Sequence, residues 1–239
     1  MSLPIEIKHL SKTYRKKIAL SDLSFNIQGN EIVGLLGANG TGKSTLIKSI
    51  LDLVEIDAGE ISIFGQSHHS SAARGGLAYL SEQFRPPHFS TGNDVLKLLA
   101  GVEGIKFSMA DITRHCEMLA LDESVLKAPC KSYSKGMRQK LGLIACLLAE
   151  KRLLMLDEPM SGLDPLARRL FKDRLLEQRE RNRSVLFSTH LLEDIESVCD
   201  RVIILDAGRI KFIGGIDELF KASGEDSLEA AFLGLITST

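Results

Sequence analysis

Short apolar runs recur along the chain and predict buried β-strands. They occupy residues 31–36, 77–80, 153–156, 184–188 and 202–205. Residues 5–7 and 23–27 alternate between apolar and polar side chains like strands, and residues 59–65 predict another strand, closed by a glycine turn. After the run at 31–36, apolar residues recur at helical spacing over 46–54. Pro165 begins a second helix that is predicted to reach about residue 181, because the first helical turn tolerates proline. Strands that alternate with helices predict an α/β fold.

The spacing of apolar residues changes from about residue 91. Helical periods are carried by Val95, Leu98, Leu99, Met109, Ile112, Cys116 and Leu119. We therefore expect residues 84–148 to form a mostly helical subdomain, inserted into a sheet domain made of 1–83 and 149–220. No internal repeat or low-complexity linker divides the chain, so residues 1–239 are expected to form a single domain.

Composition limits the classes of protein to consider. The 239 residues are 44% hydrophobic, which is sufficient for one large domain with a subdomain. A formal net charge of -1 argues against bulk nucleic-acid binding, so no nucleic-acid partner is expected. The longest apolar stretch, at 141–149, is far shorter than a membrane span of about 20 residues. The first residues also lack the apolar core of a signal peptide. We expect a soluble, intracellular protein whose membrane role would require a separate partner.

Cysteine and histidine spacing predicts no structural metal site. The four cysteines lack C-x-x-C pairing and are expected to be reduced and mostly buried. His68 and His69 are adjacent, and adjacent residues of a strand face opposite ways. No further cysteine or histidine lies near them at ligand spacing.

The sequence from Gly37 to Ser44, GANGTGKS, is the most specific chemical signal in the chain. It fits G-x-x-x-x-G-K-[ST], a loop whose backbone N–H groups wrap a polyphosphate. Lys43 can reach the β- and γ-phosphates, and the Ser44 hydroxyl can bind Mg²⁺. The predicted strand before the loop and the predicted helix after it place a helix N-terminus toward the phosphates, where its dipole favours anions. These residues predict a nucleotide site.

Two carboxylates follow the apolar strand at 153–156. Because phosphate sites form at the carboxyl ends of such strands, Asp157 can hold Mg²⁺ and Glu158 can act as the general base for an attacking water. The alternative is an acidic turn after a core strand. The phosphate loop upstream favours the functional interpretation.

Three further segments complete a recognisable order: YSKGMRQ at 133–139, SGLDP at 161–165 and STH at 188–190. With the phosphate loop and the carboxylate strand, they resemble the nucleotide-binding subunit of ATP-binding cassette (ABC) transporters, from residue 4 to about 220. The resemblance implies a P-loop NTPase core of the ABC ATPase type with an antiparallel β subdomain and an inserted α-helical subdomain. It also implies a closing C-terminal helix within 221–239.

The resemblance implies a role for individual residues. Tyr14 would stack on adenine, His190 would contact the γ-phosphate, and Gln83 would contact Mg²⁺ and the attacking water. The implied catalytic residues are Glu158, His190, Gln83 and Lys43. The implied nucleotide-binding residues are Tyr14, Gly37, Asn39, Gly40, Thr41, Gly42, Lys43, Ser44, Thr45 and Asp164, with Ser134 and Gly136 toward the ATP of a partner subunit. The implied Mg²⁺ ligands are Ser44, Gln83 and Asp157. Taken alone, Tyr14 could be a surface aromatic and His190 a satisfied loop residue.

One segment departs from the common family pattern. The signature usually reads L-S-G-G-Q, whereas Lys135 here replaces a glycine and Met137 replaces the glutamine. The remaining Ser134 can cap a helix that runs through Leu148 and points its positive end at phosphate. This variant resembles the export branch of the family, and export is the expected direction.

The expected function is therefore ATP hydrolysis by a head-to-tail dimer, with ATP and Mg²⁺ bound between the subunits. The dimer could contain two copies of this chain or one copy and a related chain. It would drive an integral membrane permease and lie at the cytoplasmic face of the membrane through that partner. The alternatives are an importer subunit and a soluble ABC ATPase that acts on DNA or ribosomes.

Overall fold

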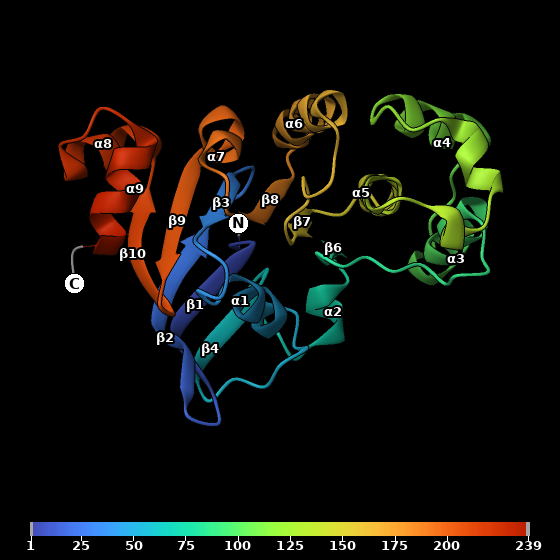
Figure 1. Cartoon of the computed structure of the whole chain (residues 1–239). Helices are drawn as coiled ribbons and strands as arrows, with labels where there is room; N and C mark the ends of the chain where they lie inside the picture. Colours follow the sequence, from blue (N-terminus) through green and yellow to red (C-terminus); the bar gives the residue numbers. More distant parts are fainter. Residues whose placement is uncertain (1, 238–239) are drawn as a thin grey trace.

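Two β-sheets form the framework of the structure, a computed structural model that describes residues 2–237 (Figure 1). Residues 1, 238 and 239 lie outside the described residues. The domain predicted at 1–239 includes all three, and the C-terminal helix predicted within 221–239 includes the last two. The fold is α/β, as predicted.

The smaller sheet is antiparallel and has the strand order β2-β1-β4-β5. Its strands are β1 (Ile5–Tyr14), β2 (Lys17–Ile27), β4 (Ala58–Ile63) and β5 (Gln66–Ser67). The hairpin of β1 and β2 pairs Ile5 with Ile27 and Tyr14 with Lys17. The segments predicted at 5–7 and 23–27 are therefore parts of longer strands, which end in an exposed hairpin at Tyr14 and Lys17.

The larger sheet has the order β10-β9-β3-β8-β7-β6. Its strands are β3 (Ile32–Leu36), β6 (Leu77–Leu80), β7 (Leu153–Leu156), β8 (Ser184–Thr189), β9 (Arg201–Asp206) and β10 (Arg209–Gly214). All pairs are parallel except β9 with β10. Every residue of β3, β7 and β8 is buried, which explains their continuous apolar runs. Because β3, β8 and β7 are neighbours and parallel, the segments that follow them emerge at one edge.

Helices cover both faces of the larger sheet (Figure 1). Val33 and Leu35 of β3 belong to the core shared with α1 (Lys43–Ile50) and the smaller sheet. Ile32 and Leu36 belong to the opposite core. That core also includes buried residues of α5 (Lys135–Leu148), α6 (Pro165–Glu180), α7 (Leu192–Val198), α8 (Ile216–Ser223) and α9 (Leu228–Thr237).

Residues 84–148 are mostly helical, as their apolar spacing predicts. They contain α3 (Gly92–Glu103), α4 (Met109–Glu117), two 3₁₀ turns (Glu123–Lys127 and Cys130–Ser132) and α5. Thr91, Ser108 and Ser134 cap the three helices through their hydroxyl groups. Figure 1 shows α3 and α4 at the end of the molecule opposite α8 and α9.

Some elements were not predicted. The helices α2 (Ser71–Arg74) and α7 are too short to show a helical period, and the strand β10 is mostly half-buried. Conversely, α1 ends at Ile50, so the apolar residues at 51–54 follow the helix rather than extend it.

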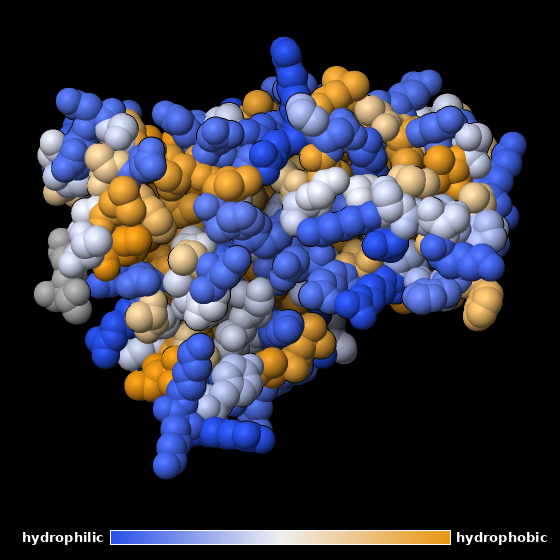
Figure 2. Space-filling view, in the orientation of Figure 1, coloured by the Kyte–Doolittle hydropathy of each residue, from blue (hydrophilic) through white to orange (hydrophobic). Residues whose placement is uncertain are grey.

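Figure 2 shows a largely hydrophilic surface with hydrophobic side chains gathered over α9 and β10. Within residues 2–237, no helix is long and apolar enough to span a bilayer.

Candidate functional site

The loop between β3 and α1 has a backbone that two glycines make possible. Gly42 has a φ of 113°, and a Cβ atom there would lie 2.6 Å from the carbonyl oxygen of Ala19. A Cβ on Gly37 would lie 2.4 Å from the carbonyl oxygen of Leu205. No side chain caps the N-terminus of α1. Because the first N–H groups of a helix lack intrahelical partners, this terminus offers several donors to an anion.

The Lys43 side chain is buried and lies back over this loop. Its Nζ donates to the carbonyl oxygens of Gly37, at 2.7 Å, and Ala38, at 3.2 Å. It also lies 3.7 Å from Oε1 of Glu158. The loop therefore holds a cation in a defined position beside a carboxylate.

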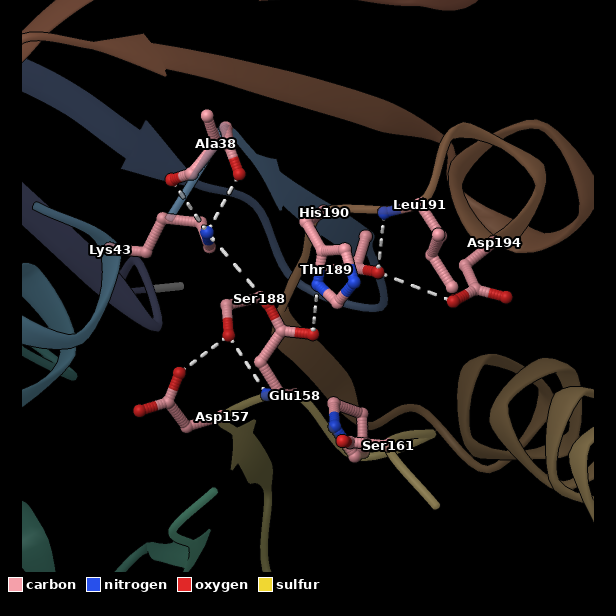
Figure 3. A network of polar contacts seen from close by, with 12 residues as sticks. Ala38, Lys43, Asp157, Glu158, Ser161, Ser188, Thr189, His190, Leu191 and Asp194 are labelled. Atoms are coloured by element: carbon pink, nitrogen blue, oxygen red, sulfur yellow. Dashed lines mark hydrogen bonds and ion pairs between the residues drawn. The ribbon is translucent and has the colours of Figure 1, made fainter. Parts of the chain in front are cut away.

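Ser188 joins the two carboxylate residues to the neighbouring strand (Figure 3). Its hydroxyl donates to Oδ1 of Asp157 at 2.6 Å and accepts the backbone N–H of Glu158 at 2.9 Å. Ser188 and Asp157 are both buried. Glu158 has a φ of 49°, a left-handed conformation that is uncommon for residues other than glycine. This hydroxyl group thus binds the carboxylate of Asp157 and the backbone of Glu158, and ties the end of β7 to β8.

Glu158 lies between Lys43 and His190 (Figure 3). His190 Nδ1 is 2.9 Å from Oε2 of Glu158, and the histidine side chain is 44% exposed. Oε1 of Glu158 is buried and has no hydrogen-bond partner. An acceptor of this kind, beside an ammonium group, suits a water molecule that donates a proton.

A cavity of about 450 Å³ opens over these groups. Among the predicted residues, it is lined by Tyr14, Asn39, Gly40, Gly42, Lys43, Ser44, Thr45, Glu158 and His190. Its volume lies within the usual range for small-molecule sites, about 300–1,000 Å³. Loop backbone donors, the Ser44 and Thr45 hydroxyl groups and the Glu158 carboxylate form a set that fits a nucleotide with Mg²⁺. Asp157, the other predicted carboxylate, is buried and does not line the cavity.

Thr41 and Gln83 were also predicted, but they do not line the cavity. Thr41 closes the loop through its hydroxyl, which donates to the carbonyl oxygen of Ala38 at 3.0 Å. Gln83 is exposed, and its Oε1 accepts a hydrogen bond of 2.6 Å from Arg85. Its neighbour Glu82 lines the cavity instead.

Ser134, Gly136 and Asp164 do not line the cavity either. Ser134 and Asp164 cap α5 and α6, and a Cβ on Gly136 would lie 2.6 Å from the carbonyl oxygen of Gly162. Lys140 donates to Asp164 at 2.8 Å, and this contact is the main cause that lowers the pKa of Asp164. Contact of these three residues with nucleotide stays a prediction that requires a second subunit.

Four residues that line the cavity were not predicted: Lys17, Ala19, Glu82 and Ser161. Ser161 belongs to the SGLDP segment and accepts a hydrogen bond of 2.7 Å from Lys135. The signal for this contact was the lysine in place of the usual signature glycine. Lys17 and Ala19 belong to the β1–β2 hairpin, where nothing in the local pattern marks them.

Comparison with known proteins identifies the family. A family model described as ABC transporter matches residues 20–161, which is more than half of the chain. The chain belongs to the ABC transporter family. It is 36% identical, over 88% of its length, to 69% of the uncharacterized ABC transporter ATP-binding protein YhcH of Bacillus subtilis. It is 34% identical, over 86% of its length, to 66% of the Nod factor export ATP-binding protein I of Rhizobium etli.

A solved structure described as an ATP-binding subunit of an ABC transporter is similar over the whole fold. It has a TM-score of 0.88 and 35% sequence identity, with 98% of this chain and 99% of that chain covered. The predicted family and the predicted ABC ATPase fold are confirmed. The chain is therefore an ABC transporter ATP-binding subunit, and the family implies ATPase activity.

Proposed function

We propose that this chain hydrolyses ATP at the 450 Å³ cavity and drives a separate membrane permease, in the direction of export. The observation that carries the catalytic part is the position of Glu158, which lines the cavity and whose Oε1 lies 3.7 Å from Lys43 Nζ without a hydrogen-bond partner. Glu158 would accept a proton from the water that attacks the γ-phosphorus, while the bond from that phosphorus to the bridging oxygen breaks.

The surrounding residues would divide the remaining work. Lys43, the loop glycines and the start of α1 would bind the phosphates, with Asn39, Thr41 and Thr45 beside them. His190 would orient Glu158 and contact the γ-phosphate, and Tyr14 would stack on the base. Ser44 and Asp157 would hold Mg²⁺, which supplies positive charge to the β- and γ-oxygens. Gln83 would join them after exchanging its bond to Arg85.

The active unit in this proposal is a head-to-tail dimer. Ser134 and Gly136 lie at the N-terminus of α5 and do not line the cavity of their own chain, so they are available to ATP bound by a second subunit. Asp164, at the start of α6, would lie at the same junction. In this arrangement 1–83 and 149–220 form the nucleotide-binding core, 84–148 the signature subdomain and 221–239 the C-terminal segment.

The export direction rests on resemblance. The signature variant at 133–137 resembles the one in the export branch of the family, and the relative from Rhizobium etli is named for Nod factor export. The permease would hold the subunit at the cytoplasmic face of the membrane. Purification of the tagged chain from native membranes tests this assignment. A permease without a substrate-capture protein supports export, a capture protein indicates import, and a ribosomal or DNA-bound partner overturns the transport role.

The catalytic assignment is tested by Glu158→Gln, which keeps the shape of the side chain and removes its basicity. We expect retained ATP binding and a loss of turnover of about 10²-fold or more. Glu82→Gln is the matched control, because this carboxylate lines the same cavity and has no proposed role in proton transfer. Wild-type turnover by Glu158→Gln would refute the general-base role.

A further inference from the structure

Asp52, His68 and His69 form a cluster outside the nucleotide cavity. Asp52 follows α1, and the two histidines follow β5. One ring nitrogen of each histidine and one carboxylate oxygen of Asp52 all lie within 4.8 Å of one another. The expectation that the adjacent histidines face opposite ways was wrong, because β5 ends at Ser67 and the ring centroids of His68 and His69 are 4.0 Å apart.

His68 has a buried nitrogen that lacks a partner. The residue is 3% exposed, and its Nδ1 lies 3.2 Å from the carbonyl oxygen of Ile61. A carbonyl oxygen only accepts, so Nδ1 carries the proton and Nε2 keeps its lone pair. Nε2 is buried and has no hydrogen-bond partner. A histidine that donates one N–H to a backbone carbonyl and presents the other nitrogen is the usual arrangement of a metal ligand.

Asp52 is oriented by a second residue. Arg74 donates to Oδ2 of Asp52 at 3.1 Å and to the carbonyl oxygen of His68. The other carboxylate oxygen, Oδ1, lies 2.9 Å from Nδ1 of His69. Hydrogen-bonded carboxylates of this kind are common beside metal ions, although the charge of Arg74 lowers the affinity for a cation.

The chemistry of the three side chains selects the ion. Two imidazoles and one carboxylate suit Zn²⁺, which binds three protein ligands and a water in a tetrahedral arrangement. Ca²⁺ and Mg²⁺ prefer sets made of oxygen ligands. A cavity of about 400 Å³, which His68 and His69 line, offers an entry path.

We propose that Asp52, His68 and His69 bind one Zn²⁺ ion through two imidazole nitrogens and Oδ1 of the carboxylate. The ion would join Asp52, two residues after the end of α1, to the segment between β5 and α2. The helix α1 begins at the phosphate loop. None of the three ligands lines the nucleotide cavity. The proposal therefore does not depend on the proposed ATPase and transport function.

The test is a calorimetric titration of Zn²⁺ into the full-length, EDTA-treated protein without nucleotide. We expect one equivalent to bind, and His69→Ala and Asp52→Asn each to weaken binding by about tenfold or more. His69→Ala is a mild change for folding, because the side chain is 64% exposed. Equal thermal unfolding of the metal-free wild type and variant would verify this.

Two further variants decide where the ion binds. His9→Ala is the matched control, since Nδ1 of His9 lies 2.8 Å from Oδ1 of Asp22 in an exposed pair that no third ligand completes among residues 2–237. We expect its affinity for Zn²⁺ to equal that of the wild type. Weakened binding in His190→Ala but not in His69→Ala would place the ion in the nucleotide site and overturn the proposal. Absent binding in the wild type, or unchanged binding in His69→Ala, would also overturn it.

Co²⁺ provides an independent test of the ligand set. Bound to the wild type, it should show tetrahedral ligand-field absorption without thiolate-to-metal charge transfer, because the three ligands carry nitrogen and oxygen only. A thiolate band would assign the ion to the cysteines and refute the proposed site.

Discussion

Removal of the Ser188 hydroxyl separates the role of this group in catalysis from its role in stability. Ser188→Ala leaves Oδ1 of Asp157 and the N–H of Glu158 without their partner, in a region that is buried. A hydrogen bond to a carboxylate contributes about 1.5–3 kcal/mol and one between neutral groups about 1 kcal/mol. The free energy of unfolding should therefore fall by about 3 kcal/mol. Displacement of Glu158, the proposed general base, by a fraction of an ångström should lower kcat by about 10–100-fold.

Ser184→Ala is the matched control for this change. Ser184 lies in the same strand, is equally buried, and makes two hydrogen bonds, from Asn30 N–H at 3.0 Å and to the Gln28 carbonyl at 3.1 Å. Its loss should cost about 2 kcal/mol of stability and leave kcat unchanged, because it lies at the opposite end of the strand. Urea denaturation and steady-state ATPase assays measure the two effects. The positioning role of Ser188 would be refuted if both variants kept the wild-type kcat, or if kcat fell by the same factor in both.

Three shorter predictions concern the phosphate loop, the cap of α6 and the stacking of Tyr14 on adenine. Gly42→Ala should abolish nucleotide binding in equilibrium dialysis while secondary structure is retained, because a Cβ would lie 2.6 Å from the Ala19 carbonyl at a φ of 113°. Asp164→Ala should destabilise the protein by about 1 kcal/mol at neutral pH through loss of the α6 cap. The hydrogen bond from Lys140 lowers the pKa of Asp164 in the folded protein. The stability difference between wild type and variant should therefore be complete above the usual aspartate pKa and vanish as the pH falls through the lowered pKa of Asp164. Denaturation at several pH values measures it. Tyr14→Ala should weaken ATP binding by about 5–10-fold, and Tyr14→Phe should not, if the ring stacks on adenine.

The sequence alone identified two kinds of element: strands that are buried on both faces of the sheet, and segments marked by motif residues. The strands β3, β7 and β8 appear as unbroken apolar runs, and the phosphate loop and α5 are marked by their glycines and capping serine. The elements that were missed, such as α7 and β10, are short or half-buried. Their position depends on the sheet against which they pack, and no local pattern carries that information.

The candidate site divides in the same way. Lys43, Glu158 and His190 could be named from motifs, because each follows an apolar strand with a characteristic short segment. Their meeting at one cavity depends on the order of β3, β8 and β7 in the sheet, which brings residues more than a hundred positions apart to one edge.

Two other contacts depend on how separate elements pack together. The partnership of Lys135 with Ser161 requires α5 to pack beside the segment before α6, and the pairing of His69 with Asp52 requires the end of β5 to lie against the end of α1. The sequence by itself determined which residues are candidates for phosphate chemistry, because backbone freedom and charge are local properties of the chain. Only the tertiary structure decided which of these groups meet, because strand order and helix packing are set by the shared core.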